Sequence, residues 1–306
     1  MLDKKLILFG GKGGVGKTTL SSATALLLSR KGRRVLLVST DPAHSLSDIL
    51  GVEGKGILKV TEGLHVLEID PEGVVKEYIK NALASIEPLV SPDVFEKVRE
   101  AFRSVEETPG TEESATLEEL SKTVLRSYDD YEHFVIDTAP TGHTLQMLKT
   151  VGRVGAWLEE LLKRRKTAKR FWSAGGRDKE DRALDILEER RRRFSRFSEI
   201  LLSRETLFVP VLNPERLSIE ETSRLVTSLR KLGVGVDTLV VNKVLPENVR
   251  DEFLTARKEQ EREYMREIEE RFRGMRIVKM PMRDRDVRGM EQLEEVAVEL
   301  GRRLGV

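Results

Sequence analysis

The residues with the clearest chemical signature lie between Gly11 and Thr19, where the chain reads Gly-Lys-Gly-Gly-Val-Gly-Lys-Thr-Thr. Two glycines separated by four residues precede Lys17 and Thr18, which is the spacing of a phosphate-binding loop. Glycines let backbone N–H groups turn inward around phosphate oxygens, and the N-terminus of a following helix adds a positive end. In such a loop the lysine contacts the β- and γ-phosphates and the threonine hydroxyl ligates Mg²⁺. The spacing therefore predicts a nucleotide site; a glycine-rich turn without a ligand is the alternative.

Short apolar runs, separated by helical patterns, must position this loop. The runs are Leu6–Gly10, Val35–Thr40, His65–Ile69, Phe134–Thr138, Thr206–Val211, Thr238–Asn242 and Arg276–Met280. Most of them are almost continuously apolar, which is typical of strands buried on both faces of a parallel sheet. The sequence therefore predicts an α/β fold with a doubly wound, mostly parallel sheet. The phosphate loop would connect the first strand to a helix that begins at Lys17.

Two stretches between the strands are much longer than one crossover helix needs, and both carry helical spacing. They predict an inserted all-helical subdomain made of residues 71–131 and 151–204. The core would then comprise residues 1–70, 132–150 and 205–306. Residues 166–181 are expected to form a loop with a glycine-rich tip.

Charge divides the predicted insert. The stretch from Glu72 to Glu132 has 15 acidic and 7 basic residues, whereas Lys163 to Arg196 has 14 basic and 6 acidic residues. We expect the two halves to pack together and neutralise each other. The alternative is a patch formed by Lys163–Lys169 and Arg190–Arg193 that docks a partner or an anionic surface.

Composition excludes several classes of function. The 306 residues are 39% hydrophobic and 34% charged, with a net charge of +1, so nothing global indicates a nucleic-acid partner. No apolar run is long enough to cross a membrane, and the N-terminal residues do not resemble a signal peptide, so we expect a cytoplasmic protein. Cysteine is absent, which excludes disulfides and thiolate metal sites.

Lys12, directly after the first glycine, marks the deviant form of the phosphate loop. With it the chain resembles a family of ATPases that act as dimers, among them the nitrogenase iron protein, the arsenite-pump ATPase and the tail-anchored-protein targeting ATPase. The resemblance implies a homodimer with ATP and Mg²⁺ at its interface. It also implies that Lys12 reaches the partner's nucleotide and is catalytic; a solvated loop lysine is the alternative.

Three further segments resemble the targeting and arsenite-pump branches of this family. They are Ser39–Asp48 and Asp137–Leu145, which match the two switch regions, and Pro281–Gly289, which matches an adenine-side loop. With Pro109-Gly110 the resemblance covers nearly the whole chain. The ATP-binding residues that it implies, together with those of the phosphate loop, are Gly11, Lys12, Gly13, Gly14, Val15, Gly16, Lys17, Thr18, Thr19, Glu215, Asn242, Pro281, Met282, Arg283, Asp284, Arg285, Asp286, Val287 and Arg288.

The predicted roles within this set differ. Asp41 follows the end of a strand and would orient the attacking water; capping of a helix at residues 43–50 is its alternative. Asp137 ends another strand and would hold Mg²⁺ through water, together with Thr18. By resemblance Asn242 reads adenine, which suits an amide with two donors and an acceptor. Glu215 either senses nucleotide near the dimer interface or stabilises the start of a helix.

The chain departs from the family at one metal site. Targeting ATPases of this kind commonly carry two cysteines that bind zinc across the dimer, but the matching stretch here is Thr255-Ala256-Arg257-Lys258. No zinc is therefore expected. Metalloid-stimulated activity, which in the arsenite-pump ATPase uses cysteines, is disfavoured on the same ground.

The sequence and this resemblance favour an ATP-driven open–closed switch that targets tail-anchored membrane proteins. Its partners would be the hydrophobic transmembrane segment of a client and a possible membrane receptor. The client groove would be lined by Ile79, Leu83, Ile86, Phe95, Phe102 and Leu120, although the same residues suit a closed helical core. An arsenite-pump-like transport ATPase and a cytosolic, ATP-regulated holdase chaperone are the alternatives.

Overall fold

The structure is a computed structural model that describes residues 1–41, 45–86, 91–106, 111–139, 159, 163, 182–248 and 251–306. Its strands are β1 (Leu6–Gly10), β2 (Val35–Ser39), β3 (Leu58–Thr61), β4 (Leu64–Glu68), β5 (His133–Asp137), β6 (Thr206–Leu212), β7 (Thr238–Val244) and β8 (Arg276–Pro281). Its helices are α1 (Lys17–Arg30), α2 (Ser45–Leu50), α3 (Pro71–Ile86), α4 (Pro92–Glu106), α5 (Thr111–Arg126), α7 (Arg182–Leu201), α8 (Arg216–Lys231), α9 (Glu252–Arg271) and α10 (Gly289–Leu304).

The eight strands form one sheet in the order β3-β4-β2-β5-β1-β6-β7-β8. Seven of them are parallel, and only β3 runs antiparallel, against β4. The predicted α/β fold with a mostly parallel sheet is therefore confirmed, and every predicted strand ends within two residues of its expected bounds. Strand β3 was not predicted, because this four-residue edge strand has no continuous apolar run.

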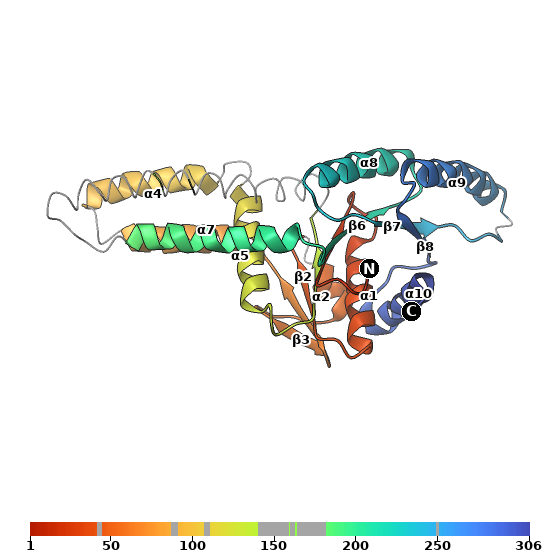
Figure 1. Cartoon of the computed structure of the whole chain (residues 1–306), viewed down its shortest axis with the longest axis horizontal. Helices are drawn as coiled ribbons and strands as arrows, with labels where there is room; N and C mark the ends of the chain where they lie inside the picture. The colour runs from red at the N-terminus through yellow and green to blue at the C-terminus, as the bar shows by residue number, and fades with distance from the viewer. Residues whose placement is uncertain are drawn as a thin grey trace.

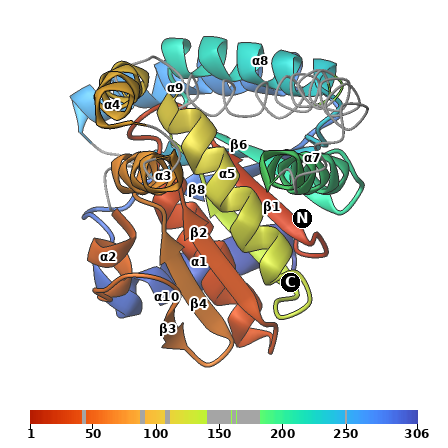
Figure 2. The same ribbon diagram turned by 90° about the vertical axis from the view of Figure 1, so that its left-hand side faces the viewer.

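Helices cover both faces of the sheet. Successive side chains of β1 point to opposite faces, and all of them are buried, so both faces must be covered. Ile7 and Phe9 pack with residues of α1, α2 and α10 on one face. Leu6 and Leu8 pack with residues of α5, α7 and α8 on the other. Figure 2 shows α5 crossing in front of the strands, with α1 and α10 behind them. The central strands are consequently buried along their whole length, which explains their apolar composition.

The helices α3, α4, α5 and α7 fall in the two stretches where helical spacing was found. Figure 1 shows α4 and the first half of α7 extending away from the sheet. The second half of α7 returns to it, because Phe194, Phe197 and Ile200 are buried in the core against strand residues. The start of the second predicted helical stretch, residues 151–162, and the predicted loop at 166–181 lie outside the described residues, except for Glu159. Among the described helices, none has the length and apolar character needed to traverse a bilayer.

Candidate nucleotide site

The register of the parallel strands gathers the candidate site at one edge of the sheet. Asp137, the last residue of β5, pairs with Phe9 of β1 and with Ser39 of β2. Ser39 in turn pairs with Glu68, the last residue of β4. The chain therefore leaves all four strands at the same level, which places the phosphate loop, Asp41 and Asp137 beside one another. Open α/β sheets bind ligands at this carboxyl edge.

Two loop glycines are required by their backbone conformation, and one of them also by the space around it. Gly14 and Gly16 have φ values of 77° and 93°, a left-handed region that other residues adopt only at a cost. A Cβ on Gly16 would lie 2.3 Å from the amide nitrogen of Asn242. Gly16 is therefore required by both conformation and space, and Gly14 by conformation alone.

The loop and the start of α1 present the groups that an anion needs. Helix α1 begins at Lys17, and the cap residue Gly16 supplies no side-chain acceptor for the first N–H groups. The N–H groups at the start of a helix, together with the helix dipole, favour a bound phosphate. The Lys17 side chain is buried, and its ammonium donates to the Lys12 carbonyl at 3.4 Å. Lys12 itself is only half-buried.

Asp137 is the carboxylate best suited to hold a cation. It is fully buried, and neither side-chain oxygen has a well-aligned hydrogen-bond donor among the described residues. Burial raises its pKa to about 7, although the Thr18 hydroxyl and the Lys17 ammonium oppose the shift. The positive charge of a divalent cation would stabilise the ionised carboxylate. Oxygen ligands such as this carboxylate are those that Mg²⁺ prefers. Thr18 and Asp137 therefore fit the predicted magnesium site, and Mg²⁺ there would neutralise phosphate charge.

Asp41 and Glu68 lie close enough for their negative charges to contribute to the raised pKa of Asp137. The backbone N–H of Asp41 donates to the Ser39 hydroxyl at 3.2 Å. Helix α2 starts at Ser45, and the N–H of Leu46 donates to the Glu68 carboxylate at 3.0 Å. Glu68 therefore binds the start of α2, and sequence reasoning missed it. Its place inside the predicted strand His65–Ile69 gave no signal for this role, because only the pairing with Ser39 brings it to the site.

The Asn242 side chain contacts the phosphate loop. Its amide nitrogen donates to the Val15 carbonyl at 2.8 Å. The next residue, Lys243, donates from its ammonium to the Gly14 carbonyl at 2.9 Å. Adenine recognition by Asn242 stays a prediction. Lys243 was absent from the predicted site, because a lysine after a strand carries no distinctive signal.

Glu215 and the adenine-side loop lie on the β6–β8 side. Glu215 precedes α8, makes no side-chain cap hydrogen bond, and approaches Arg257 of α9 at 3.7 Å. Side-chain capping of α8 is thus not its role, and nucleotide sensing stays a prediction.

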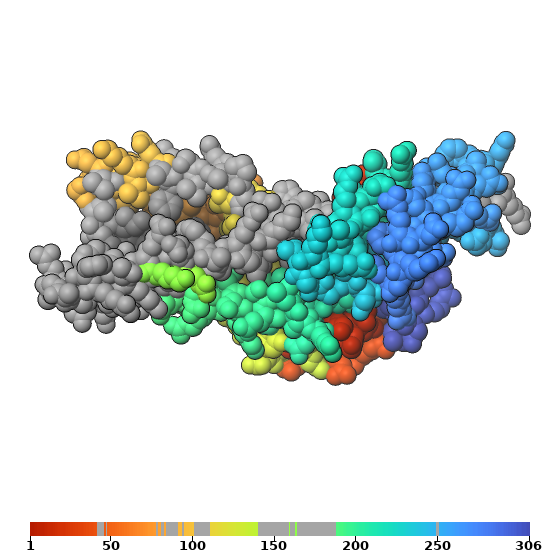
Figure 3. Space-filling model, turned by 45° about the horizontal axis from the view of Figure 1, so that its top comes forward, coloured from red at the N-terminus to blue at the C-terminus, as the bar shows by residue number. Residues whose placement is uncertain are grey.

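Pro281 ends β8, and the following residues up to Arg288 connect it to α10. In this loop Arg283 pairs with Glu295. Figures 1 and 3 show α8 and α9 side by side.

The stretch that matches the family's zinc site forms the first turns of α9. Thr255 donates to the carbonyl of Asp251, which caps this helix. Lys258 is buried and pairs with the equally buried Glu261 at 3.0 Å. An ion pair within one chain therefore occupies this position.

The predicted groove residues have different environments. Ile79 and Leu83 of α3 and Phe95 of α4 are half-buried. The side chains of Ile86 and Phe102 lie outside the described part of the chain. Leu120 is only 1% exposed and packs in the core with Leu117 and Val124, so in this arrangement it faces no groove.

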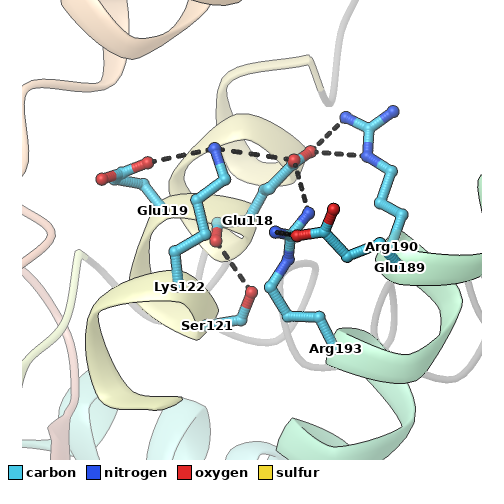
Figure 4. Close-up of polar contacts among 7 residues, drawn as sticks. All are labelled: Glu118, Glu119, Ser121, Lys122, Glu189, Arg190 and Arg193. Carbon is cyan, nitrogen blue, oxygen red and sulfur yellow. Dashed lines mark hydrogen bonds and ion pairs between the residues drawn. The ribbon is translucent and has the colours of Figure 1, made fainter. Parts of the chain in front are cut away.

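The acidic and basic halves of the insert meet at Glu118 of α5 (Figure 4). Its carboxylate accepts from Arg190 at 3.0 Å and from Arg193 at 3.2 Å, both on α7. Lys122 lies 3.6 Å away on the same helix, and only 12% of the Glu118 side chain is exposed. The expected packing of opposite charges is seen at this contact.

The strand, glycine loop and helix, followed by a buried aspartate at a neighbouring strand end, define a P-loop ATPase. The chain belongs to the anion-transporting ATPase family, whose profile matches residues 4–302. A putative arsenical pump-driving ATPase 2 of Aquifex aeolicus (strain VF5) is 45% identical over 291 residues, 95% of this chain and 97% of that protein. The ATPase get3 of Aspergillus terreus (strain NIH 2624 / FGSC A1156) is 33% identical over 310 residues, which cover 94% of this chain and 88% of that protein.

Proposed function

We propose that this ATPase works as a homodimer in which ATP binding and Mg²⁺-dependent hydrolysis switch the arrangement of the helical layer, and that the switching drives transport of an anion. The observation that carries the proposal is the convergence of the phosphate loop, Asp41 and Asp137 at one sheet edge. The 45% identity to a putative arsenical pump-driving ATPase, over nearly the whole of both chains, supports the transport role.

Each residue at this edge has a defined task in the proposed reaction. Lys17 and the N–H groups at the start of α1 hold the phosphates, and Thr18 with Asp137 holds Mg²⁺. Asp41 orients the water for in-line attack. Lys12, which is half-buried at the loop edge, reaches across the dimer to the partner's nucleotide.

The chemistry of the chain limits what the transport substrate touches. Trivalent arsenic prefers thiolate ligands, as other soft metal centres do, and this chain has no cysteine. A metalloid would therefore have to bind a membrane partner, and the ATPase would supply only the driving force. We accordingly expect arsenite to leave the ATPase rate of the isolated protein unchanged.

Targeting of tail-anchored proteins is the second candidate, supported by the outward helices. Apolar side chains of Ile79, Leu83 and Phe95 are half-buried on α3 and α4. A transmembrane segment presents ~20 apolar residues, about 30 Å of helix, which one helical layer cannot surround alone. Two layers brought together in a closed dimer would provide the second wall.

One experiment with two arms separates these functions. In the first arm, inverted membrane vesicles from cells that express the wild-type chain or Asp41→Asn are tested for ATP-dependent arsenite uptake. In the second arm, the purified protein is crosslinked to a single-span tail segment or to a soluble unfolded protein. Uptake that requires Asp41 supports the transport role. Tail-segment capture without uptake overturns it in favour of targeting, and capture of both substrates favours a holdase.

The crosslinking arm includes variants matched for burial. Ile79→Glu, Leu83→Glu and Phe95→Glu should block capture while the melting temperature stays near that of the wild type. Leu120→Ala serves as the core control and should cost about 2–4 kcal/mol of stability. If every glutamate variant melts as early as Leu120→Ala, these residues form a closed core and the targeting role fails.

A further inference from the structure

Strand β7 contains one residue more than its neighbour at its carboxyl end. Val241 pairs with Lys279 and Val244 with Pro281, so three steps along β7 match two along β8. Within this irregularity lies Lys243, with a φ of 58°, the only non-glycine residue with a positive φ among the described residues. The left-handed backbone conformation is unfavourable for a lysine and costs of order 1 kcal/mol or more.

The irregularity changes where two neighbouring side chains point. Successive side chains of a regular strand lie on opposite faces of the sheet. Here Asn242 and Lys243 both reach the phosphate loop, with donor–acceptor distances of 2.8 Å and 2.9 Å. The extra residue and the left-handed backbone therefore bring both donors to the same loop.

Their acceptors are the carbonyls of consecutive loop residues, Gly14 and Val15. A loop that points its N–H groups toward a phosphate must turn carbonyl groups away from it, and those carbonyls need donors. Asn242 and Lys243 supply donors at two successive positions. The Lys243 contact is charge-assisted, which strengthens it relative to a neutral pair.

The end of β7 is itself held firmly. The N–H of Leu245 donates to Glu261 at 2.9 Å, and the Leu245 carbonyl accepts from Lys258 at 2.6 Å. The Val244 carbonyl accepts from the N–H of Met282 at 2.7 Å. The buried Lys258–Glu261 pair thus fixes the backbone just beyond Lys243, which keeps the unusual conformation in place.

We propose that Lys243 is a positioning residue for ATP hydrolysis: it holds the Gly14 carbonyl so that the loop N–H groups face the phosphates before nucleotide binds. It touches the loop and not the reacting atoms. Its loss should weaken ground-state and transition-state binding alike, and so raise KM with little change in kcat.

The test separates the side chain from the backbone. Lys243→Gly removes the ammonium and relieves the left-handed strain, Lys243→Asn tolerates the conformation without the reach, and Lys243→Arg keeps a cationic donor. Lys55→Gly, which removes an exposed lysine of the loop before β3, is the control. The measurements are ATPase kinetics, the Kd of a fluorescent ATP analogue, and the melting temperature without nucleotide.

We expect Lys243→Gly and Lys243→Asn to raise KM and Kd about three- to tenfold, the range of one typical hydrogen bond at an exposed position. Lys243→Gly should melt at or above the wild-type temperature, and Lys243→Arg should restore affinity. Wild-type affinity in Lys243→Gly would overturn the proposal. So would a loss that accompanies early melting and is not recovered by arginine, because that would make Lys243 merely structural.

Discussion

At the carboxyl edge of the sheet, the loop from Gly11 to Thr19 is fixed by strand register, by left-handed glycines and by donors from β7. Between α5 and α7, in contrast, an ion network around Glu118 adds to the apolar packing farther along both helices. The pairing register of a strand cannot shift by small amounts, because a shift by one residue turns every side chain of the strand to the other face. Ion pairs of long side chains tolerate small displacements.

This difference suits the two tasks proposed for the molecule. Phosphate transfer needs groups held in fixed positions, since a small misplacement costs rate. A helical layer that changes its arrangement during each ATP cycle needs contacts that can break and form again. Four predictions test whether chemistry and movement are divided between the two regions in this way.

The largest effect is expected at Asp41. If its carboxylate orients the attacking water, Asp41→Asn should slow turnover about 10²–10⁴-fold and still bind ATP. Single-turnover hydrolysis and nucleotide binding measure the two properties separately. A mixture with Lys12→Ala should regain activity, because each mixed dimer has one site with an intact Asp41 and a wild-type lysine opposite. Full activity in Asp41→Asn would remove the catalytic assignment.

Asp137 should make the nucleotide-free protein sensitive to pH. Its folded-state pKa of about 7 lies above the ordinary 3.8, so between these values the folded chain keeps a proton that the unfolded chain has lost. Stability should therefore fall as pH rises through this interval. Asp137→Asn should reduce that slope, raise the melting temperature at pH ~8 and abolish Mg²⁺-dependent hydrolysis. Melting curves from pH ~5 to ~8 check the sign; an unchanged slope contradicts it.

Glu118→Gln should loosen the helical layer and spare the chemistry. It leaves Arg190 and Arg193 without their half-buried counter-charge, which should cost about 1–3 kcal/mol of stability. The basal ATPase rate should stay within about twofold of the wild type. The activation free energy would then change by much less than the ~1.4 kcal/mol that corresponds to a tenfold change in rate. Glu72→Gln, in the exposed pair with Lys76, is the control and should cost under about 0.5 kcal/mol. Equal effects in both variants would mean that the Glu118 network contributes no more than a surface pair.

The smallest effect is expected from chelators. Lys258, in the stretch that matches the family's zinc site, forms an ion pair with Glu261, so zinc chelation should change neither dimerisation nor partner binding. Gel filtration with and without chelator, at constant Mg²⁺, measures this directly. A stoichiometric zinc found by elemental analysis would contradict the expectation.

The sequence predicted the parts of this molecule that depend on local pattern. The continuous apolar runs gave the central strands, and the spacing of Gly11, Gly16 and Lys17 gave the loop between β1 and α1. The positions of Asp41 and Asp137 near the loop could also be predicted. Asp137 ends its strand, Asp41 follows one, and the carboxyl ends of parallel strands lie at the same edge of the sheet.

The missed features depend on register or on long-range contacts. The position of Glu68 at the site follows from its pairing with Ser39, which no local pattern encodes. Lys243 is one of many lysines, and only the irregular end of β7 turns it toward Gly14. The burial of Leu120 reflects the path of α5 across the sheet, whereas its helical spacing fitted a groove equally well.

The two borders of the sheet restrict how copies of this chain can assemble. At one border β3 is short and irregular in its pairing, and at the other β8 exposes Arg276 and Lys279 and ends in a proline. Short, charged or proline-bearing borders discourage strand addition. A second copy is thereby steered away from extending the sheet and toward contacts through loops and helix ends. The strand ends that carry the phosphate loop supply such a surface, so pairing of two chains would bring their nucleotides face to face.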